Sequence, residues 1–144
     1  MLIIGEGTLC LMDGADAAIR SGEMDAIKQI SYTIKDIYNL PEGKRAELIN
    51  GQIYMMAPPS TKHQKLISAL HGKIYNYIES HNGNCEIIPA PFAVFLKDND
   101  ENESYVEPDI SVICNPDKLD DKGCNGAPDW VIEIVSPSSQ RMDT

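Results

Sequence analysis

The sequence is poor in positive charge and in long apolar runs. It holds 12 Lys and Arg against 22 Asp and Glu, which gives a formal net charge of −10 at pH 7. This balance argues against non-specific affinity for nucleic acid, because phosphate binding depends mainly on Lys and Arg, although a local basic groove is not excluded. No apolar run approaches the roughly 20 residues of a membrane-spanning helix, and Met1–Met12 lacks the features of a secretory signal. We therefore expect a soluble, cytoplasmic protein without a membrane partner.

Cysteine is also scarce, and its spacing gives no metal-binding pattern. No C-x-x-C pair occurs, and the spacing fits neither a zinc ribbon nor a dense disulfide framework. The four cysteines are Cys10, Cys85, Cys114 and Cys124. We expect them to be free thiols.

The length suits one domain. With 144 residues, of which 42% are hydrophobic, the chain can build one core but is too short for two ordinary domains. The first two dozen residues show no sustained hydrophobic period. We therefore predict an N-terminal extension over 1–24 and a single globular domain over 25–144.

Local signals early in that domain predict a short helix and a β-hairpin. Thr33 is a plausible N-cap for a helical run that continues through Tyr38. Asn50 and Gly51 stand between two arms of alternating apolar residues, which is the signature of a type I′ turn. An acidic residue, Glu47, lies on the first arm.

The strongest helix signal follows the hairpin. Ser60 or Thr61 can cap its start, and Asn82-Gly83 is a typical stop. Apolar residues recur at three- and four-residue steps and form the stripe that buries one helix face. These residues are Leu66, Ile67, Leu70, Ile74 and Ile78. His63 borders this face.

The next segment, Cys85–Leu96, has the composition of a strand but contains Pro89 and Pro91. Proline cannot donate to a strand ladder, so it is confined to edge strands and bends. The sequence therefore predicts an edge position or a bend here.

Two further strand-like runs, 106–114 and 129–135, each carry an acid in their interior, Asp109 in the first and Glu133 in the second. Between them lies a loop, 115–127, that is built largely from Asn, Pro, Asp and Gly. Such a loop favours an antiparallel connection of the two strands. In a symmetric register, residues whose numbers sum to 242 face one another, and this places the two carboxylates directly opposite, with Cβ atoms about 5 Å apart.

Two carboxylates at that distance repel one another, so one must take up a proton or a cation must lie between them. A divalent metal satisfies both acids, and hard oxygen ligands select Mg²⁺ or Mn²⁺ over zinc. The alternative interpretation is that Asp109 and Glu133 cap strand ends or pair with Lys and Arg at the surface. The spacing alone leaves both interpretations open.

Three stretches together resemble a known family. The segments "AELINGQIYMMAPPSTKHQ", "VEPDISVI" and "GAPDWVIEIVSPSSQRMD" are similar to the Uma-two family of prokaryotic putative restriction endonucleases, a branch of the PD-(D/E)XK nuclease superfamily. The match extends over roughly Ser31–Asp143, in order and with sensible spacing. The resemblance implies a mixed α/β fold, with a central sheet flanked by helices, and a site that hydrolyses phosphodiester bonds with Mg²⁺.

The resemblance also implies roles for three acids. Asp109 matches the acid of the "PD" motif, Glu133 matches the first residue of the "ExK" motif, and Glu47 matches a further acid near the metal. His63 and Gln64 match an "HQ" pair that could approach the site from the helix start. A histidine packed at a capped helix entrance is the alternative interpretation for the last two.

The sequence departs from the superfamily pattern at the lysine. The residue two positions after the glutamate is Val135, and the resemblance places the lysine on the next helix, after Asp143 and beyond the last residue, Thr144. We therefore expect a domain that is incomplete at its C-terminus, with weak activity. Its exposed apolar surface should lead either to self-association, for example as a homodimer, or to a marginal fold. Lys62 and Lys65 could substitute for the lysine, although a solvated helix face is the favoured interpretation for both.

Two other features have ordinary structural interpretations beside functional ones. We expect Trp130, in an apolar strand, to be a core residue rather than a platform for base stacking. The "SPSS" segment, Ser136–Ser139, could place a helix N-terminus near a phosphate, or could be an ordinary turn between strand and helix.

The sequence therefore predicts a metal-dependent DNA endonuclease in which Asp109 and Glu133, with Glu47 nearby, bind Mg²⁺ or Mn²⁺ that polarises a phosphate and activates water. The alternative is a non-catalytic domain that keeps the nuclease scaffold for binding or assembly. The acidic charge and the absent lysine favour this alternative.

Overall fold

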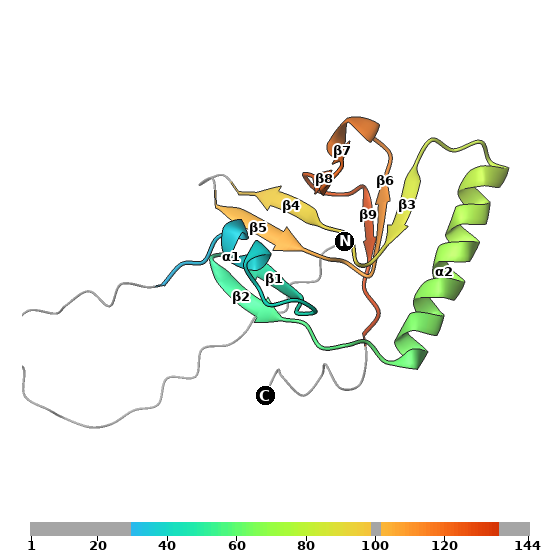
Figure 1. Cartoon of the computed structure of the whole chain (residues 1–144). Helices are drawn as coiled ribbons and strands as arrows, with labels where there is room; N and C mark the ends of the chain where they lie inside the picture. Colours follow the sequence, from blue (N-terminus) through green and yellow to red (C-terminus); the bar gives the residue numbers. More distant parts are fainter. Residues whose placement is uncertain (1–29, 99–101, 136–144) are drawn as a thin grey trace, which may run out of the picture. The chain divides into compact units, whose positions relative to one another are not determined.

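The fold consists of two β-sheets, each packed against one helix (Figure 1). The structure is a computed structural model that describes residues 30–98 and 102–135. Apart from residue 30, these belong to one compact unit, Ser31–Thr144. The predicted boundary after residue 24 lies outside the described residues, as does the "SPSS" segment. No helix in the described ranges is both long and apolar enough to cross a membrane.

The larger sheet has six strands in the order β2-β1-β5-β4-β8-β7. All neighbouring pairs are antiparallel except β4 and β8, which are parallel, so the sheet is mixed. A short helix, α1 (Ile34–Tyr38), buries Ile37 in a cluster with residues of this sheet. The strands are β1 (Ala46–Ile49), β2 (Gln52–Met55), β4 (Val94–Lys97), β5 (Glu103–Val106), β7 (Leu119–Asp120) and β8 (Gly123–Asn125).

The smaller sheet has three strands in the order β3-β6-β9, with β6 at its centre. The long helix α2 (Thr61–Ser80) packs its apolar stripe against it. The strands are β3 (Glu86–Pro89), β6 (Ile110–Ile113) and β9 (Trp130–Ile132). The mixed α/β fold is therefore confirmed, but the described strands form two sheets instead of a single central one.

The predicted short helix and hairpin are both present. The backbone N–H and the hydroxyl of Thr33 donate to the Asp36 carboxylate at 2.7 and 2.9 Å, which closes the first turn of α1. In the hairpin, Ile49 pairs with Gln52. Asn50 and Gly51 between them have φ angles of 50° and 74°, as a type I′ turn requires.

Helix α2 begins and ends where the sequence indicates. The Ser60 hydroxyl accepts a hydrogen bond from the His63 N–H at 3.2 Å, and the Gly83 N–H donates to the Ile78 carbonyl at 2.9 Å beyond the last turn. Ile67 is buried, and the later members of the stripe pack around it. Leu66 is the exception, with 43% exposure, because it lies about 100° around the helix from Ile67.

The proline-containing segment forms both an edge strand and a bend. β3 is the edge strand of the smaller sheet and ends at Pro89. A cis peptide bond joins Ala90 to Pro91, and the chain then enters the larger sheet at Val94. This departure divides the strands between two sheets, and the prediction of an edge or a bend is confirmed.

The pairing of β6 with β9 has the predicted register. Ile110 faces Ile132 and Val112 faces Trp130, so the residue numbers of each pair sum to 242. The connection is more structured than expected, since it includes a 3₁₀ turn, η1 (Pro116–Lys118), and the β7–β8 hairpin.

The prediction that Trp130 is a core residue is wrong, because its exposure is 49%. It begins an edge strand that is paired only with β6 among the described residues, so a large part of the indole remains open to solvent. Sequence composition could not distinguish an edge strand from a central one.

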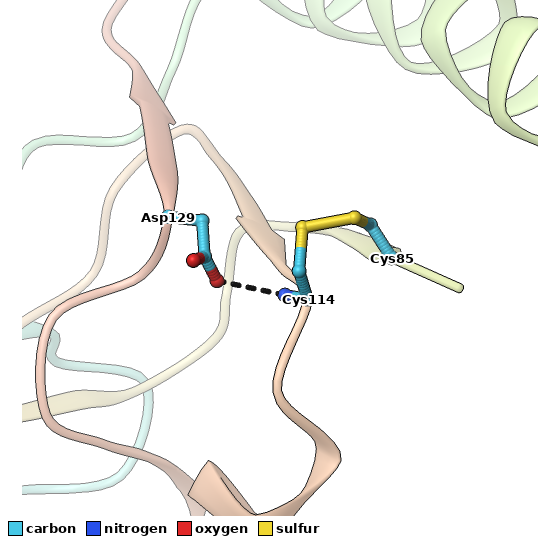
Figure 2. The surroundings of a disulfide bond; sticks show 3 residues. All are labelled: Cys85, Cys114 and Asp129. Atoms are coloured by element: carbon cyan, nitrogen blue, oxygen red, sulfur yellow. Dashed lines mark hydrogen bonds between the residues drawn. A yellow bond between two sulfur atoms is a disulfide. The ribbon is translucent and has the colours of Figure 1, made fainter. Parts of the chain in front are cut away.

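The expectation of free thiols is wrong for two of the four cysteines. Cys85 and Cys114 form a disulfide (Figure 2), and their Cα atoms are 3.9 Å apart. The register of β3 against β6 explains the pairing, because Glu86 faces Ile113 and the next pair outward is Cys85 and Cys114. Cys124 is free and buried, as expected, and Cys10 lies outside the described residues.

Reduction of this disulfide should destabilise the fold. The bond joins residues 29 positions apart, and closing a loop of that length in the unfolded chain corresponds to about 3 to 4 kcal/mol in the chain-entropy model. Urea unfolding with and without dithiothreitol measures the difference. The double variant Cys85→Ser/Cys114→Ser is the control and should be insensitive to the reductant. Equal stability of the oxidised and reduced protein would contradict the prediction.

Candidate active site

Asp109 lies where three parts of the chain meet. It immediately precedes β6, and its carbonyl accepts the Ala90 N–H at 2.9 Å. One carboxylate oxygen, Oδ2, accepts the backbone N–H of Ile134 at 2.7 Å. Nε2 of His63, in the first turn of α2, lies 3.1 Å from the same oxygen. The Asp109 side chain is 15% exposed. These contacts fix the carboxylate between β6, the segment after β9 and the start of α2.

The contact with His63 defines a proton position. An ionised carboxylate can only accept hydrogen bonds, so the imidazole must donate through Nε2. The other ring nitrogen, Nδ1, lies 3.3 Å from Oε1 of Gln64. His63 of the predicted "HQ" pair thus contacts Asp109 directly, and the Gln64 side chain lies beside the other ring nitrogen of His63.

Glu133 stands opposite Asp109 when the β6–β9 register is continued by one pair beyond the strand ends. The pKa of Glu133 is raised to about 7. Burial of its carboxyl group is the largest cause, and the negative charges of Asp109 and Glu47 add to it, although the residue as a whole keeps exposed surface. The three predicted acids therefore form one electrostatic cluster.

Glu47 reaches this cluster from the larger sheet. It lies on β1, and its Oε1 accepts the backbone N–H of Glu107 at 2.9 Å. Because Glu107 is two residues before Asp109, this bond anchors the approach to β6. The hairpin arm that carried Glu47 in the sequence thus contributes to the same region as the β6–β9 pair.

Sequence reasoning missed the role of a fourth acid, Glu107, which is 8% exposed. Arg45 donates to its Oε2 through Nε at 2.8 Å and also through Nη2, and the Tyr105 hydroxyl donates to its Oε1 at 2.7 Å. Burial, and then this hydrogen bond, raise the pKa of the Tyr105 hydroxyl. Glu107 is therefore a structural ion-pair partner. The signal available in the sequence was its spacing: Glu107 is two residues from Asp109 in the strand-like run 106–114, which would place both on one face of a strand.

The two interpretations left open for Asp109 and Glu133 can now be compared. Within the described ranges, neither acid pairs with a Lys or Arg. Asp109 does accept a backbone N–H, as a capping residue would. Capping uses Oδ2 alone, so it does not account for the repulsion that Glu133 experiences.

The donor set fits a hard divalent cation in charge and in atom type, because the cluster consists of carboxylates, and burial followed by the charges of Asp109 and Glu47 raises the pKa of Glu133. The geometry is less complete. No group of three His, Cys, Asp or Glu side chains in the described part of the chain is arranged to hold a metal ion. The residues therefore provide suitable ligand chemistry without a closed coordination shell.

The predicted cationic residues lie at the surface. Lys62 and Lys65 are exposed on α2, as a solvated helix face requires. Val135, at the superfamily's lysine position, is 72% exposed. Asp143 lies outside the described residues.

Comparisons with known proteins agree with this architecture. A family model, Uma2, described as "Putative restriction endonuclease", matches residues 34–144. A curated relative, "Uncharacterized protein slr1290" of Synechocystis sp. (strain ATCC 27184 / PCC 6803 / Kazusa), is 28% identical over 100 residues, which is 69% of this chain and 50% of the relative. The chain thus spans about half the length of this relative.

A solved structure is also similar. It is a putative nuclease belonging to DUF820 from Anabaena variabilis ATCC 29413, with 25% sequence identity and a TM-score of 0.56. The match covers 74% of this chain and 59% of that one.

Replacing Glu133 by Gln should stabilise the metal-free protein at neutral pH. Folding raises the pKa of this carboxyl from 4.5 to about 7, so the folded state binds the proton more tightly than the unfolded state. Stability is therefore lost as pH rises from 4.5 to about 7. The Glu133→Gln variant has no ionisable group at this position, so its free energy of unfolding should fall less over this pH range. Urea unfolding in EDTA across this range measures the effect.

The matched control is Glu86→Gln, which removes an exposed carboxyl from β3 and should keep the wild-type pH profile. A large loss of stability for Glu133→Gln at every pH would contradict the prediction, because it would identify Glu133 as one half of a structural ion pair.

Proposed function

This chain belongs to the Uma2 family of putative restriction endonucleases, and we propose that it is a metal-dependent DNA endonuclease that hydrolyses phosphodiester bonds. The observation that carries the proposal is the cluster of Asp109, Glu133 and Glu47, in which mutual repulsion contributes to raising the pKa of Glu133 to about 7. A cation between the carboxylates would relieve this repulsion.

The protein's own contribution is to hold the acids in place. The Ile134 N–H and His63 both contact Oδ2 of Asp109 and so fix the orientation of its carboxylate. The Glu107 N–H donates to Oε1 of Glu47, so the Oε2 atom of Glu47 is the one that we propose as a metal ligand. Glu133 is held against Asp109 by hydrogen bonds to the Asp109 backbone and side chain, and a cation would replace the side-chain contact. Mg²⁺ or Mn²⁺, when bound here, would polarise a phosphate oxygen and lower the pKa of the attacking water.

Positive charge beside the attacked phosphate is the missing element of this mechanism. A phosphodiester that approaches three carboxylates meets more negative charge than one divalent ion neutralises, so a neighbouring cation is needed to favour the transition state. Lys62, next to His63 in the first turn of α2, is the cation that we assign to this role, because Lys65 projects about 200° around the helix from His63.

The second candidate function is a domain that keeps the nuclease scaffold for binding or assembly. The observation in its favour is Val135, which stands at the superfamily's lysine position and is exposed. Such a domain would bind its partner but would not cleave DNA, whichever divalent metal ion is present.

Metal binding should depend on the paired acids. Titration of the protein with Mn²⁺ by isothermal calorimetry should give a binding isotherm that Asp109→Ala and Glu133→Ala each abolish, because each variant removes a ligand. Asp117→Ala removes an exposed acid from η1 and should bind Mn²⁺ as the wild type does. Unchanged binding in both site variants would remove these residues from the metal site.

Cleavage should be metal-dependent and should need the same acids. Supercoiled plasmid incubated with Mg²⁺ or Mn²⁺ should be nicked by the wild type, and Asp109→Asn and Glu133→Gln should lower the rate on the order of 100-fold or more, the usual effect of losing a group that stabilises the transition state. EDTA should abolish cleavage. Folded, metal-binding protein that cleaves neither plasmid nor single-stranded DNA would favour the binding domain.

A further inference from the structure

Positive charge is concentrated on one helix of this acidic protein. The chain carries a formal charge of −10, yet α2 contains three lysines, Lys62, Lys65 and Lys73, and no acid before Glu79 in its last turn. The balance on the helix is therefore opposite in sign to that of the chain as a whole.

The three lysines share one face. At 100° per residue, they fall within an arc of about 80°, on the side of the helix opposite to Ile67. All three are exposed, whereas Ile67 is buried against the smaller sheet. Figure 1 shows α2 alongside β3, which leaves the outer side of the helix uncovered by the described strands. No described carboxylate lies within ion-pair distance of any of these lysines.

This basic face, defined as Lys62, Lys65 and Lys73, starts in the same helix turn as His63, with Lys62 about 100° around the helix from that side chain. Lys62 adjoins His63, whose imidazole contacts the Asp109 carboxylate at 3.1 Å. From Lys62 to Lys73 the helix rises about 16 Å. The face thus leads away from the carboxylate cluster along a single straight element.

We propose that the basic face of α2 binds the sugar-phosphate backbone of DNA next to the scissile phosphate. The inference rests on the proposed function and extends it, since it assigns the surface that holds the substrate. The carboxylate cluster repels a polyanion, so the attraction must come from a neighbouring surface, and among the described elements α2 alone combines several lysines with contact to the cluster.

Charge complementarity favours DNA over a lipid surface. A helix that binds a membrane inserts an apolar face, but α2 already buries its apolar stripe against β3 and β6. The large hydrophobic residues exposed on α2 are Leu66, Tyr75 and Tyr77, and they do not form one continuous stripe, as a membrane-binding face would require. Lysines that form no ion pairs are suited to phosphates, which they contact as point charges.

The proposal makes a quantitative statement about salt. Each phosphate that a lysine neutralises in a duplex contributes about −0.9 to the slope of log K against log salt concentration. Three lysines that each contact one phosphate would therefore supply about −2.7 of the total slope.

The experiment measures binding separately from cleavage. Fluorescence anisotropy of a labelled 20-base-pair duplex in EDTA, over about 50 to 200 mM salt, is compared for the wild type and two variants of equal charge. Lys62→Gln/Lys65→Gln/Lys73→Gln alters the basic face. Lys35→Gln/Lys44→Gln/Lys122→Gln alters exposed lysines on α1, its following loop and the β7–β8 turn.

The α2 variant should bind at least tenfold more weakly at low salt, and its slope should be smaller in magnitude by about 2 to 3. The control variant should change affinity less than threefold. On the wild type, DNA should protect the three α2 lysines from acetylation, as read by mass spectrometry, and leave the control lysines reactive. This second measurement does not depend on the folding of any variant.

The outcomes separate this proposal from the proposed function. DNA binding that depends on the α2 lysines, without cleavage in any metal, supports the basic face and refutes the nuclease activity. Cleavage by a protein whose α2 lysines are unprotected and whose α2 variant binds normally refutes the basic face alone. A wild type that binds no duplex, or that binds anionic phosphatidylserine vesicles in place of DNA, also overturns the proposal.

Discussion

The carboxylate of Asp109 is the interaction on which the candidate site depends. Through one oxygen it joins the start of β6 to the Ile134 N–H and to His63 of α2. The backbone N–H and the imidazole both contact this one oxygen, so the fold holds the carboxylate in a single orientation. The strand pair and the start of the helix are therefore joined by one side chain.

Acids in this region have divided roles, although they share short stretches of sequence. Glu107 is buried and neutralised by Arg45, which stabilises the segment that leads into β6. Two residues later, Asp109 has no described Arg or Lys partner, and Glu133 opposite it is held in a field that opposes its ionisation. Among the described residues, the fold thus pairs one of these acids with an arginine and leaves its neighbours without a Lys or Arg partner.

The features that depend on neighbouring residues were predicted well from the sequence, whereas those that depend on contacts between distant segments were not. Asn50-Gly51 defined a hairpin, Ser60 began α2, and the symmetric loop gave the register that brings Asp109 and Glu133 together. The disulfide was missed because the pairing of β3 with β6 joins segments separated by two further strands. The exposure of Trp130 was missed because it depends on the position of β9 in the sheet. For the site, acid positions were readable, whereas the His63 contact required the docking of α2.

The disulfide and Asp109 lie immediately beyond opposite ends of the four-residue strand β6. In a strand this short, few ladder hydrogen bonds oppose sliding, and a slip by one residue would turn every side chain to the other face of the sheet. A covalent link between Cys85 and Cys114 forbids that slip along β3. The disulfide therefore fixes the register that positions Asp109 at the other end of β6. Because Cys114 is exposed, the redox potential of the surroundings can act on this bond.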